Sequence, residues 1–140
     1  MNNSIYPCLW FDGNASEAAT FYCGVFRNSR IIHDTPLVVT FELDGKKFMG
    51  LNGGPKFKFT EAVSFVVECN TQEEIDYYWT KLTEGGEESM CGWLKDKFGV
   101  SWQIVPSILG ELMNNPERAP RVTQAFLKMR KFDIEALLKA

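Results

Sequence analysis

The sequence predicts an α+β fold of paired βαβββ modules that form a curved mixed sheet with a cavity, followed by C-terminal helices. The chain has 140 residues, 45% hydrophobic and 24% charged, which favours one globular domain, residues 1–140. A pattern of strand, helix and three strands occurs twice, in residues 5–53 and 62–106, on either side of a linker at 54–61. The remaining segment, 107–140, is patterned as helices.

The first repeat begins with a strand from Ile5 to Phe11, because these residues are β-branched and aromatic and a turn sequence, Asp12-Gly13, follows them. Asn14 is placed to cap a helix, and Glu17 completes a capping box. The Asp-Gly pair at 44–45 predicts a hairpin between the last two strands. The strands expected after the helix are Arg30 to His33, Leu37 to Leu43 and Lys47 to Leu51.

Glycine and proline interrupt the pattern at Asn52-Gly53-Gly54-Pro55, where the linker begins. The second repeat then opens with a strand from Ala62 to Cys69. Thr71 caps its helix with Glu74 in a second capping box, and Gly85-Gly86 ends that helix. Three short strands are expected near Glu88 to Met90, Gly92 to Lys95 and Val100 to Val105.

The helices of the two repeats align with one offset of 57 residues, which places Asn14 and Glu17 on Thr71 and Glu74. Half a curved sheet cannot close over its own concave face. The two modules are therefore expected to share a cavity, and the cleft between them is the default binding site.

The segment after the second repeat is expected to form helices whose apolar side chains serve packing. Asn115-Pro116 predicts a helix start, and Asp133 is placed to cap a last short helix. The apolar stripe between them is typical of packing rather than of a ligand site. Its members are Val122, Ala125, Phe126 and Met129.

Charge and composition exclude several classes of protein. The net charge of −3 gives no nucleic-acid footprint, and no apolar run approaches the roughly 18 residues that span a bilayer. The N-terminal residues lack the basic and apolar regions of a signal peptide, so the protein is expected to be cytoplasmic. The four cysteines form no Cys-x-x-Cys pair, which excludes a zinc knuckle and favours buried apolar roles for all four.

Five stretches of the sequence carry a family resemblance: they are residues 11–15 (FDGNA), 41–45 (FELDG), 51–55 (LNGGP), 77–79 (YYW) and 91–103 (CGWLKDKFGVSWQ). With the doubled unit, they resemble the PhnB-like branch of the vicinal oxygen chelate superfamily. That superfamily includes glyoxalase I, extradiol dioxygenases and the bleomycin- and fosfomycin-resistance proteins. Members of the branch are often labelled 3-demethylubiquinone-9 3-methyltransferase, but this sequence has no Gly-rich loop after a strand to support a nucleotide-like cofactor.

The resemblance implies one glyoxalase-like domain and a homodimer. Pairing of modules across chains is one arrangement it implies, and Gly53-Gly54-Pro55 would then be the exchange point.

The resemblance also implies a divalent metal, held by His, Glu or Gln side chains on the first and last strand of each module. The corresponding positions here are Pro7, Met49, Ser64 and Gln103. Only Gln103 is a plausible ligand for a first-row metal, so we expect neither a catalytic metal nor another cofactor. A register one residue away offers Cys8, but its partners become Phe65, Gly50 and Trp102.

Aromatic side chains on the predicted strands favour a flat or apolar organic ligand. Trp10, Trp93 and Trp102 are expected to line the cavity or pack in the core. Gln103 and Ser64 would supply the polar contacts that orient the ligand. If Ser64 faces the cavity, alternation places Glu68 on the same side, where it is a weak candidate for a general base or an exposed strand-end carboxylate.

These observations lead to a small organic molecule as the expected partner, bound between the modules without a catalytic metal. The alternative is a lyase or dioxygenase-type enzyme that uses another metal site or Glu68 as its base. A third hypothesis is that the helical tail mediates contact with another protein, which would predict no ligand-sized cavity. Neither nucleic acid nor membrane is an expected partner.

Overall fold

The computed structural model describes residues 3–140 and divides the chain into two compact units. Unit 1 ends at Phe59, and unit 2 spans Thr60–Ala140. The boundary falls inside the predicted linker. Within the described residues, no helix is long and apolar enough to cross a membrane.

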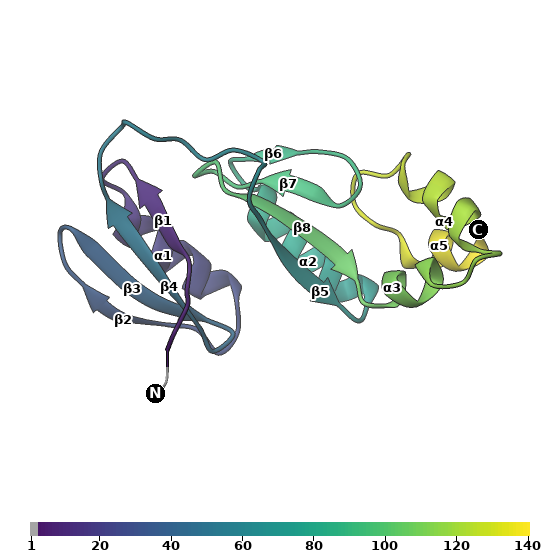
Figure 1. Cartoon of the computed structure of the whole chain (residues 1–140), viewed down its shortest axis with the longest axis horizontal. Helices are drawn as coiled ribbons and strands as arrows, with labels where there is room; N and C mark the ends of the chain where they lie inside the picture. The colour runs from purple at the N-terminus through teal and green to yellow at the C-terminus, as the bar shows by residue number, and fades with distance from the viewer. Residues whose placement is uncertain (1–2) are drawn as a thin grey trace. The chain divides into compact units, whose positions relative to one another are not determined.

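Unit 1 is a four-stranded mixed sheet with one helix (Figure 1). Its strand order is β1-β4-β3-β2, with β1 and β4 parallel and the other pairs antiparallel. Its elements are β1 (Cys8–Phe11), α1 (Ala15–Val25), β2 (Arg30–Asp34), β3 (Val38–Leu43) and β4 (Lys46–Asn52).

Unit 2 repeats this topology with the strand order β5-β8-β7-β6, in which only β5 and β8 are parallel. The repeated strand, helix and three strands confirm the predicted α+β fold of two βαβββ modules. The cavity shared between modules stays a prediction. The elements of unit 2 are β5 (Ser64–Cys69), α2 (Gln72–Thr83), β6 (Glu87–Glu88), β7 (Trp93–Lys95) and β8 (Ser101–Pro106).

Each helix covers one face of its own sheet. Ala15, Ala18 and Ala19 are buried on α1, and such small side chains bring a helix close to the strands. At Gly50 of β4, an added Cβ would lie 3.1 Å from the Cβ of Ala15, so a larger residue there would crowd the helix. The buried side chains of α2 are Ile75, Trp79 and Leu82.

The two helix starts differ from each other. The capping box at Thr71 is confirmed, because its side chain accepts from the Glu74 amide and the Glu74 carboxylate accepts from the Thr71 amide. The capping box predicted at Asn14 is wrong, since Asn14 makes no capping hydrogen bond with its side chain. Asn52, at the end of β4, accepts a hydrogen bond of 2.9 Å from the Ala15 amide instead.

The first connection between strand and helix is one residue longer than the second. Residues 12–14 join β1 to α1, whereas residues 70–71 join β5 to α2. The helices therefore keep the offset of 57, but the strands are offset by 58, as from Phe11 to Cys69. Because strand side chains alternate, this single residue decides which side chains share a face.

Most of the predicted linker is folded onto unit 1. The Gly53 amide donates to the Phe11 carbonyl (3.0 Å), and the Trp10 indole N–H donates to the Gly54 carbonyl (2.8 Å). The Phe57 ring lies edge-on to Trp10, with centroids 4.8 Å apart. A Cβ at Gly53 would lie 2.3 Å from the indole, so no larger residue fits there.

The C-terminal segment packs within unit 2 as three short helices: α3 (Ile108–Met113), α4 (Ala119–Phe126) and α5 (Ile134–Lys139). Asp133 caps α5 as predicted, by accepting from the Ala136 amide. Asn115 caps a turn instead, and α4 begins only at Ala119. Val122 and Phe132 are buried.

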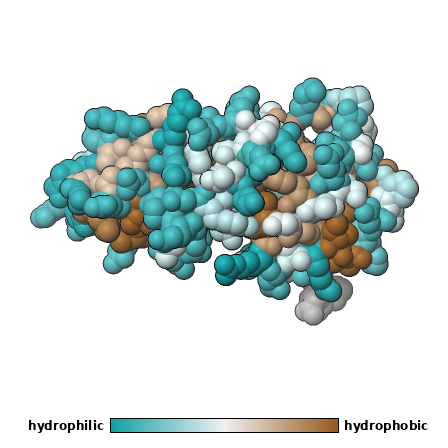
Figure 2. Space-filling model, turned by 180° about the vertical axis from the view of Figure 1, so that it is seen from behind, coloured by the Kyte–Doolittle hydropathy of each residue, from teal (hydrophilic) through white to brown (hydrophobic). Residues whose placement is uncertain are grey.

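The surface is largely hydrophilic, with hydrophobic patches between the polar groups (Figure 2). Exposed large apolar residues include Leu37 in unit 1 and Val63 and Val66 in unit 2. The cysteines differ from the expectation that all four are buried: Cys69 is buried, but Cys8 is exposed and the other two are half-buried. Burial and the charge of Glu74 raise the pKa of Cys69 to about 11, so this thiol is inert at neutral pH.

Candidate ligand-binding site

Two rows of side chains cross the face of the unit 2 sheet that points away from α2, which we call the helix-distal face. Strand pairing and alternation place them there, because the intervening residues Leu94, Trp102 and Ile104 are buried. The first row consists of Glu87, Lys95, Ser101 and Ser64. The second row consists of Trp93, Gln103 and Val66.

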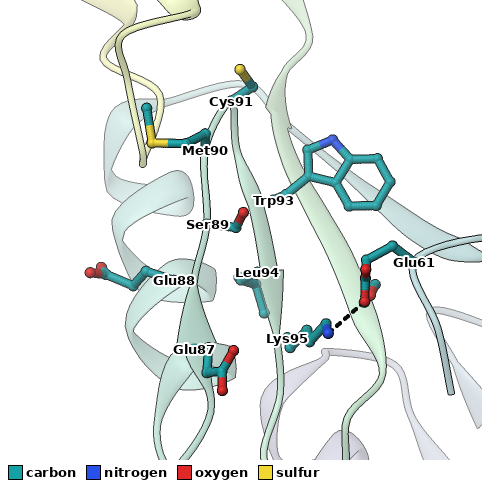
Figure 3. A pocket seen from close by; sticks show the side chains of 10 residues that line it. Glu61, Glu87, Glu88, Ser89, Met90, Cys91, Trp93, Leu94 and Lys95 are labelled. Atoms are coloured by element: carbon teal, nitrogen blue, oxygen red, sulfur yellow. Dashed lines mark ion pairs between the residues drawn. The ribbon is translucent and has the colours of Figure 1, made fainter. Parts of the chain in front are cut away.

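A hollow of about 470 Å³ opens over β6 and β7 (Figure 3). Trp93 and Lys95 reach it from β7, and the Glu61 carboxylate meets Lys95 there. This volume is within the range of small-molecule pockets. The lining residues are Glu61, Glu87, Glu88, Ser89, Met90, Cys91, Trp93, Leu94, Lys95 and Ser101.

Lys95 and Glu61 form an ion pair of 2.5 Å at the hollow. The hydrogen bond and charge of Glu61 raise the pKa of Lys95, and Lys95 lowers the pKa of Glu61 by the same two effects. Both groups therefore stay charged at neutral pH. Lys95 is a positive charge and hydrogen-bond donor here, and it lacks the depressed pKa that makes a lysine nucleophilic.

The structure brings Ser64 and Gln103 together. The Gln103 amide donates to the Ser64 hydroxyl oxygen at 3.0 Å, between β8 and β5. This bond fixes the amide so that its carbonyl oxygen remains as an acceptor for a ligand. Trp93 lies opposite Gln103 on the neighbouring strand, so an aromatic ring and an oriented amide stand side by side.

Ser101 is a site residue that the sequence analysis missed. It is 1% exposed and lines the hollow, and within residues 3–140 its hydroxyl has no hydrogen-bond partner. A buried hydroxyl without a partner is costly, which favours a bound group that satisfies it. Lys95 and Glu61 were missed as well. Alternation from Gln103 and Trp93 points to Ser101 and Lys95, but no sequence signal places Glu61.

The three tryptophans have different surroundings. Trp93 is half-buried at the hollow. Trp102 is 4% exposed on the α2 side of the sheet, where its indole donates to Asp96 (2.8 Å), so it lies in the core rather than on Gln103's face. Trp10 belongs to unit 1, where it holds the Gly54 loop.

The remaining predicted positions lie in unit 1. Cys8 pairs with Met49, and the burial of Leu9 toward α1 places Cys8 and Trp10 on Met49's face. Pro7 precedes β1 and is out of phase with that face, although its carbonyl accepts from the Met49 amide at 3.0 Å. This difference follows from the longer first connection, which the helix offset did not reveal.

These residues do not fit the divalent metal that the superfamily resemblance implies. Unit 1 offers a thiol and a thioether, Cys8 and Met49, and unit 2 offers a hydroxyl and an amide, Ser64 and Gln103. The resemblance implies a set of His, Glu or Gln ligands, and of these four side chains only Gln103 belongs to that set. Among the residues that the structure describes, no three His, Cys, Asp or Glu side chains are grouped to hold a metal.

Glu68 lies two residues along β5 from Val66 and pairs with Val105. It is exposed and lies outside the lining of the hollow. The role of this carboxylate as a general base stays a prediction.

Comparisons with known proteins place the fold and the family. The family model for 3-demethylubiquinone-9 3-methyltransferase matches residues 3–105. A PhnB protein from Bacillus cereus with the same description is 35% identical, with a TM-score of 0.69, and the alignment covers 75% of this chain and all of that one. No curated protein matches the chain.

Two more distant structures share the fold alone. A Pseudomonas aeruginosa protein is 20% identical, with a TM-score of 0.64 over 75% of this chain and 98% of its own. The fosfomycin resistance protein of Listeria monocytogenes, complexed with Mn(II) and sulfate, is 14% identical, with a TM-score of 0.62 over 81% of this chain and 97% of its own. From the match over residues 3–105 and the identity to the Bacillus cereus PhnB protein, we conclude that this chain belongs to the PhnB-like family of the vicinal oxygen chelate superfamily.

Proposed function

We propose that unit 2 binds a small organic molecule on its helix-distal face, without a catalytic metal. The observation that carries this proposal is the oriented Gln103 amide, which lies outside the lining of the hollow but pairs with Trp93, whose ring lines it. Pockets for small molecules combine such apolar rings with a few fixed polar groups. The unpartnered hydroxyl of Ser101 gives the same face a further polar group to satisfy.

The chemistry of the face favours binding over covalent catalysis. Trp93 offers a flat surface for an aromatic or apolar part of the ligand. The Gln103 carbonyl accepts a hydrogen bond, and the Lys95–Glu61 pair offers a donor and an acceptor for a polar group. Because Lys95 stays an ammonium group, it orients or polarises a ligand rather than attacking it.

The test is a binding screen of aromatic carboxylates, amides and amines against the full-length protein, followed by titration of each hit by calorimetry. Replacing Gln103 or Ser64 by alanine should weaken binding by about threefold to tenfold, since each loses one hydrogen bond. Trp93→Ala should weaken binding further, and Gln124→Ala, an exposed glutamine of α4, is the matched control. If every hit binds the Gln103 and Ser64 variants unchanged, the proposed site is wrong.

A further inference from the structure

The segment 129–134, which we call the strap, follows α4 in unit 2 and ends at the first residue of α5. The carbonyls of Met129 and Arg130 accept hydrogen bonds of 2.8 Å from the amides of Cys91 and Gly92. These two amides belong to the connection between β6 and β7. The strap therefore holds that connection through two backbone hydrogen bonds.

The same connection forms one wall of the hollow, which we call the rim and define as Ser89, Met90 and Cys91. Cys91 has φ +59° and Gly92 has φ +81°. A left-handed conformation is costly for a residue with a side chain, so Cys91 needs support from outside the turn. The strap supplies that support.

Side chains lock the strap in place. The Gln72 side chain, from the first turn of α2, donates to the Phe132 carbonyl and accepts from the Ile134 amide, both at 2.9 Å. Lys131 pairs with Asp76 at 2.7 Å. Phe132 is buried against Gly92, where an added Cβ would lie 2.4 Å from its ring.

The strap lies outside the family match, which ends at residue 105. The Bacillus cereus PhnB protein is aligned over its whole length, yet it covers only 75% of this chain. The rim is thus part of the shared fold, whereas the segment that fixes its shape is an addition to that fold.

We infer that the strap is a positioning element that sets the shape of the rim and so determines which ligands the hollow accepts. This inference rests on the proposed function. Gln72 is its main positioning residue, because this one side chain bonds the strap at two points. Ligand selectivity in this protein is then set by a segment that the match does not contain.

The first arm of the test follows amide hydrogen exchange in the full-length protein and needs no ligand. Gln72→Ala should speed exchange at Cys91 and Gly92 by about tenfold while amides of β5 and β8 change little, because only the strap contacts are lost. Gln124→Ala, an exposed glutamine of α4, is the matched control. Equal exchange at Cys91 and Gly92 in both variants would overturn the inference.

A second variant guards against general destabilisation by Gln72→Ala. Lys131→Met removes the exposed pair with Asp76 and should speed exchange at Gly92 by about twofold. Lys128→Met, at an exposed lysine just before the strap, is its matched control. A uniform effect of Lys131→Met over the whole of unit 2 would contradict a local role for the strap.

The second arm measures binding of the aromatic dye anilinonaphthalene sulfonate by fluorescence. Gln72→Ala should weaken binding of the dye by at least about threefold, because the rim is then no longer fixed. Gln124→Ala should leave dye binding unchanged. Binding that depends on Trp93 but not on Gln72 would refute the strap inference and leave the proposed function standing. Absence of dye binding to the wild-type protein would count against the proposed function, and exchange at Cys91 and Gly92 would then decide the strap inference alone.

Discussion

Asp96 shows how one buried carboxylate organises the turn between β7 and β8. It is 3% exposed, and its oxygens accept hydrogen bonds from the amides of Phe98 (2.8 Å) and Val100 (3.1 Å) and from the Trp102 indole (2.8 Å). These bonds place β8 next to β7, and with it Gln103 and Ser101. The helix-distal face thus depends on a residue on the opposite side of the sheet.

Replacing Asp96 by alanine should lower the free energy of unfolding by about 3 to 5 kcal/mol, because three donors lose their acceptor in a mostly buried turn. Urea denaturation measures the change. Asp12→Ala, at an exposed turn, is the control and should stay within about 0.5 kcal/mol of wild type. A loss below about 1 kcal/mol for Asp96→Ala would show that water replaces the carboxylate.

Asn52 has a comparable role at the start of α1, where it replaces the local cap. Its side chain accepts from the Ala15 amide and donates to the Pro36 carbonyl, both at 2.9 Å. Asn52→Ala should therefore destabilise the protein by about 1 to 2 kcal/mol. Asn14→Ala should cost distinctly less in the same urea titration. If Asn14→Ala destabilises the protein more than Asn52→Ala does, Asn14 is the residue that caps α1.

At the scale of elements, the strap is joined to α2 by a pair that depends on pH. The hydrogen bond from Lys131, followed by that from Gln72, lowers the pKa of Asp76 below its ordinary value of 3.8. A lowered folded-state pKa gives stability that is present above 3.8 and is lost as the pH falls through the folded value. The strap is thus weakened only in acid.

Exchange at Gly92, corrected for intrinsic rates, should therefore be constant from about pH 7 to pH 4 and rise below that. Lys131→Met should reduce this rise, because it removes the largest cause of the lowered pKa of Asp76 and leaves only the hydrogen bond from Gln72. If exchange at Gly92 in the unmodified protein stays constant down to about pH 3, the Asp76 pair does not support the strap.

For the whole molecule, we predict a homodimer in solution. The prediction rests on the family resemblance, which implies a homodimer. Light scattering at micromolar concentration should give about twice the monomer mass of 16.0 kDa. A monomer mass under those conditions would refute the prediction.

The repeated module and most of its elements could be predicted from the sequence because their signals are local. The capping box at Thr71, the Asp44-Gly45 turn and the alternation around Gln103 each lie within a few neighbouring residues. Features that join distant segments could not be predicted. Asn52 caps a helix 37 residues before it in the chain, and no local pattern at Asn14 reveals the replacement.

The candidate site was predicted only in part, for a geometric reason. Both sides of β8 carry apolar or aromatic residues, so the sequence does not show that Trp102 faces α2 while Gln103 faces away. The extra residue before α1 shifts Pro7 out of phase in the same way. A slip of one position moves a strand's side chains to the other face, and sequence patterns fix position less finely than that.

The loop held by Trp10 matters for anyone who needs to label or divide this chain. The glycines at 53 and 54 look like a natural place for a fluorescent tag or an inserted domain. An insertion there would push against the indole and break its bond to Gly54, since even a methyl group at Gly53 does not fit. A cut or fusion after Phe59 leaves these contacts intact, and each resulting piece keeps a complete sheet with its own helix.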